Sequence, residues 1–216
     1  MRGRRLLAAR DRPLGEQIRA QVPVEAGIVP ADPFEHHRGV LLFLSAVVGE
    51  DRAQLGVAGG VDALAEERLV FYGDPVGTGF LTSPKSLRVQ LGDWKRPHQL
   101  IADLVQAVET LDANAIPGPY EAILSPSRYY TYMQATTEAG YPASRTVEKV
   151  LKAVHRSPVM RDGGAVFSMR GGDFVITVGG DLAPGYRWHD RESVHLFCAE
   201  TLAAQMVTPE AVGLLS

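Results

Sequence analysis

The sequence is almost free of cysteine and contains no long hydrophobic segment. Its single cysteine, Cys198, cannot form an internal disulfide, which is compatible with a reducing compartment. The longest apolar run, Val40–Val48, is about half of what a membrane-spanning helix requires. The basic residues 1–10 lack the apolar core and the cleavage site of a secretory signal. These absences predict a soluble, cytoplasmic protein with no membrane partner.

An excess of one charge and the motifs of common enzymes are missing as well. The net charge of −3 gives no global positive field, and the arginines near the N-terminus form only a weak phosphate site, so we do not expect nucleic acid as a partner. Leu55–Gly60 is rich in glycine but lacks the spacing of a nucleotide-binding loop. The adjacent His36 and His37 point to opposite sides of an extended chain and do not converge on one ion. We expect no catalytic residue, no cofactor and no metal site.

Apolar periodicity, proline and glycine predict a mixture of helices and strands. A continuous apolar run favours a buried strand, whereas apolar residues spaced three and four apart favour a helix. Proline and serine mark the expected helix starts. The expected strands are Val40–Val48, Leu87–Leu91 and Tyr120–Leu124; the expected helices begin at the cap Asp62 after a turn at Leu55–Gly60, at Pro97, at the cap Ser125, and at Pro142, the last of them ending at Val154.

The stretch from Asp162 to Pro184 is the most regular part of the sequence. Two β-prone runs, Ala165–Met169 and Phe174–Val178, flank the polar link Arg170–Asp173. Paired glycines accept the positive φ of a tight turn, so the pattern predicts a β-hairpin, with a second Gly-Gly-Asp ending the returning strand. The hairpin holds no nucleophile, base or ligand set.

Ordered motifs around this hairpin resemble the encapsulin family, the bacterial and archaeal shell proteins that share the HK97-type phage capsid fold. The motifs lie in Gly140–Lys152, Ser168–Phe174, Gly180–Tyr186 and Val207–Val212, and the resemblance runs from about Ala65 to the end. It implies an α+β, HK97 phage-capsid-like fold. The implied segments are an N-terminal arm and extended loop (E-loop) at 1–38, a P-domain with a spine helix at 39–115, an A-domain at 116–185, and a return to the P-domain at 186–216.

The resemblance also implies a structural function and not an enzymatic one. Many copies would close into an icosahedral shell built of pentamers, a cytoplasmic nanocompartment. Its cargo would be a ferritin-like protein or a dye-decolorising peroxidase, with a role in iron storage or oxidative stress. Cargo of this family carries a targeting peptide, and its docking groove includes an N-terminal helix. Gly3–Arg5 is similar to the segment that follows this helix. The resemblance therefore implies an N-terminally shortened member in which the helix is absent, and it does not determine how cargo docks.

Three sets of residues are candidate functional sites. By the resemblance, a loop lines the opening at the fivefold axis, and its repeated Glu138 would favour cations such as ferrous iron. Also by resemblance, an intersubunit arm precedes the first long strand. Trp94 lies beside basic residues, which suits stacking on a flavin or base, an interface, or a core anchor. The loop residues are Thr136, Thr137, Glu138, Ala139 and Gly140; the arm residues are Val22, Val24, Ile28 and Val29.

Alternatives remain open at this stage. Local propensity favours a helix over Ser193–Met206, whereas the resemblance requires a strand, which we favour. A phage or prophage capsid protein has the same fold. A small α/β hydrolase using His189 or His195 is the alternative from another class, although no activated serine is placed by the sequence.

Overall fold

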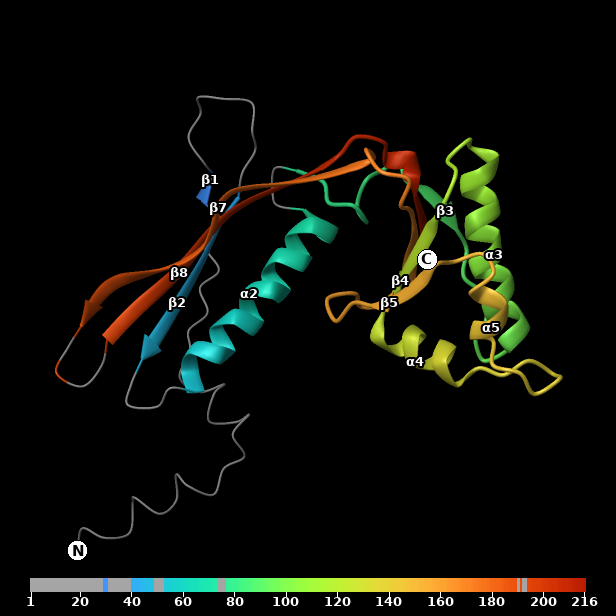
Figure 1. Ribbon diagram of the computed structural model, residues 1–216, viewed down its shortest axis with the longest axis horizontal. Coiled ribbons are helices and arrows are strands. Elements are labelled where there is room, and N and C mark those ends of the chain that lie inside the picture. Colours follow the sequence, from blue (N-terminus) through green and yellow to red (C-terminus); the bar gives the residue numbers. More distant parts are fainter. Residues whose placement is uncertain (1–28, 31–39, 49–52, 74–76, 190, 192–193) are drawn as a thin grey trace, which may run out of the picture. The chain divides into compact units, whose positions relative to one another are not determined.

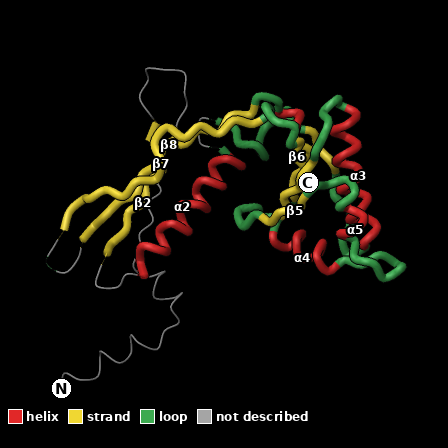
Figure 2. The backbone as a smooth tube through the Cα atoms, in the orientation of Figure 1, coloured by secondary structure: helices red, strands yellow, loops and turns green. Residues whose placement is uncertain are grey.

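The computed structural model describes residues 29–30, 40–48, 53–73, 77–189, 191 and 194–216 (Figure 1). Side chains are described from residue 63 onward, apart from a few near residue 195. The described elements mix helices and strands, as an α+β fold does (Figure 2). The helices are α2 (Ala53–Tyr72), α3 (Pro97–Ala113), α4 (Pro126–Gln134), α5 (Ser144–Val147) and the 3-10 turn η1 (Pro209–Ala211); the strands are β1 (Val29–Pro30), β2 (Val40–Val48), β3 (Leu87–Val89), β4 (Tyr120–Leu124), β5 (Ala153–Arg156), β6 (Gly164–Ser168), β7 (Phe174–His189), β8 (Val194–Met206) and β9 (Val212–Leu215).

The chain divides into two compact units, and each has its own sheet. Unit 1 comprises residues 1–65 and 178–203, and unit 2 comprises residues 66–177 and 204–216. A four-stranded sheet has the order β1-β2-β8-β7, in which β2 and β8 run antiparallel. A five-stranded sheet in unit 2 has the order β3-β9-β6-β4-β5 and contains both parallel and antiparallel pairs.

The core of unit 2 lies on both faces of its sheet. Helix α3 begins at Pro97, whose missing N–H costs nothing in a first turn, and it covers one face (Figure 1). Its buried stripe, which includes Leu100, Leu104 and Leu111, packs with Leu124 and Val166 of the sheet. A second cluster of aromatic and aliphatic side chains covers the other face: Phe71, Phe80, Ala165, Phe167, Val212 and Leu214. Strand β6 is therefore buried on both faces, and so its residues are uniformly apolar or small.

Several elements match the sequence predictions. Strands β2 and β4 have the predicted bounds, α3 begins at Pro97, and α4 follows its cap Ser125. The segment for which helix and strand competed, Ser193–Met206, contains strand β8, as we favoured. The nine-residue pairing of β2 with β8 stabilises this strand against its local helical propensity.

The predicted β-hairpin is wrong, although both of its strands exist. Strand β6 pairs with β4 along one edge and with β9 along the other, so no edge is left for β7. Strand β7 belongs to the other sheet and continues to His189, through the Gly-Gly-Asp predicted to end it. The turn itself is as predicted, because Gly171 and Gly172 both have positive φ.

Two helix predictions also need correction. The expected turn at Leu55–Gly60 lies inside α2, so Asp62 is an interior residue and not a cap. Glycine costs only about 1 kcal/mol in a helix relative to alanine, which the rest of a 20-residue helix outweighs. The helix expected over residues 142–154 is limited to α5, because residues 153–156 instead form β5 beside β4.

Candidate functional site

A short loop between α4 and α5 carries the residues predicted to surround an opening. Its base is closed where the Ala143 N–H donates to the Ala135 carbonyl at 2.9 Å and the Thr137 N–H to the Tyr141 carbonyl at 2.7 Å. At its tip, the Gly140 N–H donates to the Thr137 carbonyl at 2.8 Å, with a φ of +77° at Gly140. The loop is therefore a hydrogen-bonded turn, because backbone hydrogen bonds join the two segments that lead into and out of its tip.

The tip of this loop is available to solvent and to other molecules. Glu138, Ala139 and Gly140 are all exposed, and a methyl group added at Gly140 would meet no atom within 4 Å. Within the part of the chain that the structure describes, Glu138 forms no ion pair. The turn therefore presents one uncompensated carboxylate, which repetition around an axis would concentrate.

Large apolar and aromatic side chains flank the loop on the surface of unit 2. Tyr141 and Met133 are each 57% exposed. The Arg145 guanidinium lies 5.7 Å from the Tyr141 ring centroid, and Arg156 lies at the same distance over the exposed Tyr130. Exposed aromatics with stacked arginines are typical of surfaces that contact another protein.

The predicted intersubunit arm falls mostly outside the described residues. Val22, Val24 and Ile28 are not described. Val29 lies in β1 and pairs with Leu41 of β2 in the same chain. Its role between subunits stays a prediction.

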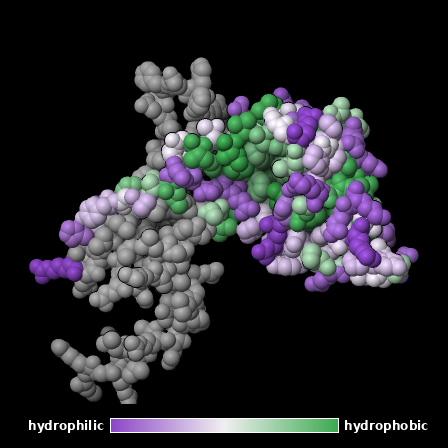
Figure 3. Space-filling model, viewed as in Figure 1, coloured by the Kyte–Doolittle hydropathy of each residue, from purple (hydrophilic) through white to green (hydrophobic). Residues whose placement is uncertain are grey.

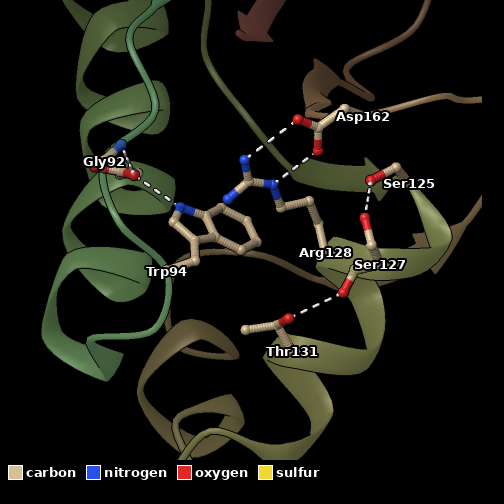
Figure 4. Close-up of polar contacts among 8 residues, drawn as sticks. Gly92, Trp94, Ser125, Ser127, Arg128, Thr131 and Asp162 are labelled. Atoms are coloured by element: carbon tan, nitrogen blue, oxygen red, sulfur yellow. Dashed lines mark hydrogen bonds and ion pairs between the residues drawn. The ribbon is translucent and has the colours of Figure 1, made fainter.

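Trp94 is a core residue of unit 2, which was one of the three roles open to it (Figure 4). Its ring is 3% exposed, so in this chain it offers no surface for stacking a flavin or base. The indole Nε1–H donates to Asp103 Oδ2 at 2.7 Å, and the Arg128 guanidinium lies 5.4 Å from the ring centroid. Arg128 also pairs with Asp162 at 3.0 Å. Trp94, in the segment before α3, therefore contacts both Asp103 of α3 and Arg128 of α4.

Asp103 is the centre of this polar network and was not recognised in the sequence. It is 1% exposed and accepts three hydrogen bonds, from Gly92 N–H at 2.8 Å, from Trp94 Nε1–H and from Gln99 Nε2–H at 2.7 Å. The signal was present, because Asp103 falls within the apolar stripe of α3. An acidic residue in such a stripe requires buried donors.

The turn between β6 and β7 is held by a bidentate ion pair. Arg170 Nε and Nη2 each donate to a different oxygen of Asp173 at 2.9 Å, across Gly171 and Gly172. The Asp173 carbonyl accepts the Val207 N–H at 2.8 Å. Hydrogen bonding from Arg170 lowers the pKa of the Asp173 carboxyl below its ordinary value. This explains the Arg-Gly-Gly-Asp spacing. The two glycines adopt the positive φ of the turn, which brings the Asp173 carboxylate within reach of two N–H groups of the Arg170 guanidinium.

Replacing Asp173 is expected to make the free energy of unfolding less dependent on pH in the acidic range. Because its pKa is lowered on folding, the carboxylate stabilises the protein fully above its ordinary pKa of 3.8 and loses this effect as the pH falls below that value. We expect Asp173→Asn to lower the free energy of unfolding by about 1–2 kcal/mol at pH 7. Below pH 4 the difference from the wild type should shrink. Urea unfolding from pH 2.5 to 7 measures both; a constant difference would contradict the pair's role, and Asp181→Asn on the exposed strand β7 is the control.

The described surroundings of His189 give no support to a catalytic role for this residue. His189 Nδ1 is hydrogen-bonded to the Tyr186 hydroxyl, and no described serine contacts it. His195 lies in β8 opposite Val47, and its side chain is outside the described set. In the described residues, no three His, Cys, Asp or Glu side chains converge as a metal site would require. None of the described helices is long and apolar enough to cross a membrane.

Comparison with known proteins identifies the relatives of this chain. Residues 50–203 match a protein family described as "Encapsulating protein for peroxidase". The type 1 encapsulin shell protein of Rhodospirillum rubrum is 34% identical over 158 residues, covering 69% of this chain and 53% of that protein. The Myxococcus xanthus type 1 encapsulin shell protein is 26% identical over 209 residues, covering 92% and 73%. The chain spans about half the length of most of the curated relatives it matches (53–58%).

Solved structures show the same fold at lower sequence identity. A virus-like particle from Pyrococcus furiosus matches with a TM-score of 0.73 and 20% identity, covering 84% of this chain and 78% of that chain. The capsid of Myoviridae phage XM1 matches with a TM-score of 0.62 and 10% identity, covering 90% and 83%. The fold predicted from the sequence, α+β of the phage-capsid type, is confirmed. The sequence relatives are named as shell proteins, which are structural proteins and not enzymes.

Proposed function

Because this chain belongs to the encapsulin family, we propose that it is a shell subunit whose copies assemble into a closed, capsid-like compartment in the cytoplasm. The observation that carries the proposal is the agreement of two independent comparisons. Its sequence relatives are named shell proteins, and its structural neighbours are a virus-like particle and phage capsids. Repetition of identical contacts about closed symmetry axes makes such a shell stable even where each contact is modest.

The assembly of the purified chain tests this function directly. We expect size-exclusion chromatography with light scattering to show a particle of many subunits, and negative-stain microscopy to show closed shells with fivefold vertices. A monodisperse monomer or dimer at micromolar concentration would contradict the proposal. The ratio of absorbance at 260 and 280 nm separates a compartment from a phage-type capsid, because only the latter would contain nucleic acid.

The division of the chain into capsid domains is also part of this proposal. We assign the arm and E-loop to residues 1–38, the P-domain to 39–115 with its return at 186–216, and the A-domain to 116–185. The two compact units of the chain have other boundaries, since unit 2 includes residues 66–115 together with most of the A-domain segment. A limited-proteolysis map of the assembled particle distinguishes the two divisions.

We further propose an enclosed enzyme as the partner of the shell. The description of the matching family, an encapsulating protein for peroxidase, favours a dye-decolorising peroxidase over a ferritin-like iron oxidase. Purification of shells from cells that express the neighbouring genes tests this choice. Haem absorbance that co-elutes with the particle supports the peroxidase, whereas ferroxidase activity supports the ferritin-like cargo and its iron-storage role.

The loop at residues 136–140 is our candidate for the rim of the fivefold opening. If Glu138 repeats around the axis, its carboxylates raise the local concentration of cations. We expect Glu138→Lys to slow the entry of ferrous iron into shells that hold a trapped chelating dye by about threefold or more. Stopped-flow absorbance measures the rate.

Two controls make this experiment specific. Glu109→Lys changes the same charge on the exposed face of α3, away from the loop, and should leave iron entry unchanged. Entry of a neutral quencher should be unaffected by either variant, because only charge is altered. Equal rates for Glu138→Lys and the wild type would refute the role of this glutamate.

A further inference from the structure

Among the described residues of unit 2, three arginines lie over aromatic rings, and they are of two kinds. The Arg128 guanidinium lies 5.4 Å from the ring centroid of Trp94, and its Nε and Nη2 groups donate to the two carboxylate oxygens of Asp162 at 3.0 and 3.4 Å. Arg128 therefore has a ring against its face and a carboxylate at its edge. Arg145 and Arg156 each lie 5.7 Å from a tyrosine ring centroid but form no ion pair with any described residue.

Arg156, at the end of β5, is held in place by Tyr130 of α4. Its guanidinium lies over the Tyr130 ring, and its Nη1 group donates a hydrogen bond to the Tyr130 hydroxyl. A guanidinium carries five N–H donors in one plane, so these two contacts leave other donors available at its edge. Both residues are exposed. A guanidinium that is already positioned loses less freedom when it binds a carboxylate by two parallel hydrogen bonds.

Apolar surface borders this arginine. Met133 follows Tyr130 by three residues on α4, so the two side chains are neighbours on the helix surface. Tyr130 is 49% exposed and Met133 57%. Figure 3 shows that the visible surface of unit 2 is mixed, with smaller hydrophobic areas among hydrophilic residues. A ligand that fits the surface at Arg156 therefore combines carboxylates with apolar groups.

The second arginine without a carboxylate lies beyond the end of α4, where Arg145 lies over Tyr141. From Tyr130 to Gln134 the helix rises about 6 Å, and the extended chain can add at most about 10 Å as far as Thr137. The Thr137 N–H donates to the Tyr141 carbonyl. The two tyrosines are therefore within about 20 Å of each other, a distance that six or so residues of extended peptide cover at about 3.3 Å per residue.

The charges nearby favour a peptide over nucleic acid. Glu138 and Glu148 are exposed in the same stretch of chain as Arg145, and neither forms an ion pair with a described residue. A nucleic acid carries one phosphate per nucleotide and would bring some of these charges close to the two glutamates. A peptide can place its carboxylates only where the arginines are. The net charge of −3 adds no general attraction for a polyanion.

We propose that Arg145 and Arg156, each positioned by a tyrosine, bind the carboxylates of an acidic, partly apolar peptide segment of another protein. The contact of Arg128 with Trp94 and Asp162 shows, within the same unit, the complete arrangement that such a segment would form at the other two arginines. The inference goes beyond the proposed shell function and does not rest on it, because it concerns one surface of a single chain.

Binding of a defined peptide to the full-length chain tests the proposal. The probe is a fluorescein-labelled dodecapeptide of alternating glutamate and leucine, and its binding is measured by fluorescence anisotropy. We expect a Kd of about 10–100 µM at low ionic strength, which weakens as salt is added. A peptide with lysine in place of each glutamate should not bind. No binding of the acidic peptide at concentrations up to about 1 mM would overturn the inference.

Matched variants locate the contact. Arg145→Gln combined with Arg156→Gln should weaken binding about tenfold or more, because two charge-assisted contacts are lost. Tyr130→Phe keeps the ring but removes the hydroxyl that positions Arg156, and should weaken binding about threefold. Lys85→Gln combined with Arg88→Gln removes the same charge from exposed residues at β3, the opposite edge of the sheet from β5, and should have no effect. Thermal unfolding should be unchanged in all of them, since the positions are exposed.

Three other outcomes would also overturn the inference. If both double variants weaken binding equally, the peptide recognises general charge and not these arginines. If single-stranded oligothymidylate binds more tightly than the peptide, and binding depends on Arg145 and Arg156, the ligand is a nucleic acid. If the peptide does not bind and only the Arg145→Gln, Arg156→Gln variant fails to assemble, a second copy covers the surface. Failure of the wild type to form shells would instead contradict the proposed function alone.

Discussion

Replacing Asp103 by alanine is expected to destabilise the protein by about 3–5 kcal/mol, because the buried Trp94 indole and two half-buried donors lose their acceptor together. The Trp94 indole N–H would then have no acceptor, because Trp94 is 3% exposed and Asp103 is 1% exposed. For a chain of this size the loss corresponds to a fall of roughly 10 °C in melting temperature. Differential scanning fluorimetry and urea unfolding measure it.

Asp93 provides the matched control for this variant. It lies in the same turn before α3 but is exposed, and its carboxylate accepts only the Lys95 N–H at 3.1 Å. Asp93→Ala should change stability by less than about 0.5 kcal/mol. Asp103→Asn should fall between the two, since an amide keeps one acceptor oxygen but presents a donor to groups that are donors themselves. Equal effects of Asp103→Ala and Asp93→Ala would show that the network does not stabilise the fold.

The second large effect is expected at Gly163, where the end of β9 passes close to the chain that leads into β6. Its φ of +75° is left-handed, and a Cβ built there would lie 2.3 Å from the Leu215 carbonyl oxygen. Gly163→Ala therefore combines a conformational cost with a backbone clash. The Gly163 carbonyl also accepts the Ser125 N–H at 3.0 Å, so movement of this residue disturbs the start of α4. We expect a loss of about 3–5 kcal/mol, measured by urea unfolding.

Gly171 separates the two contributions. Its φ is +92°, but a Cβ built there meets nothing within 4 Å. Gly171→Ala should cost only the left-handed conformation, about 1–2 kcal/mol. The difference between the two variants is the cost of the clash with Leu215. If both variants lose the same stability, the end of β9 moves aside without cost, and its close packing against Gly163 does not stabilise the protein.

Local signals predicted those parts of the fold that are determined by neighbours in sequence. Pro97 and Pro126 mark helix starts because proline at the first helical position lacks only an N–H that has no partner there. The stripe of α3 follows from helical periodicity alone. The apparent hairpin after Ala165 failed for the opposite reason. Whether two strands pair depends on the edges left free by others, and β4 and β9, which occupy both edges of β6, come from far apart in the sequence.

The candidate site could be predicted only in part. Glu138 was found through a resemblance between motifs. The sequence alone could not show that backbone hydrogen bonds close its loop into a turn. Asp103 was not singled out in the sequence, although an acidic residue within the apolar stripe of α3 requires hydrogen-bond partners. The returning strand was expected to end near Gly179, whereas β7 continues to His189, because glycine does not by itself interrupt a strand that pairs with a neighbour.

The place of β9 in the sheet of unit 2 has a consequence for synthesis. This strand, residues 212–215, lies between β3 and β6 and forms ladders with both. Residues 212–215 must be translated before β3 can gain its neighbour, so the sheet of unit 2 stays incomplete until the ribosome has passed that point. A chain that has not yet reached residue 215 therefore lacks the complete sheet of unit 2. The position of one short strand thus makes complete folding of unit 2 wait for the synthesis of residues 212–215.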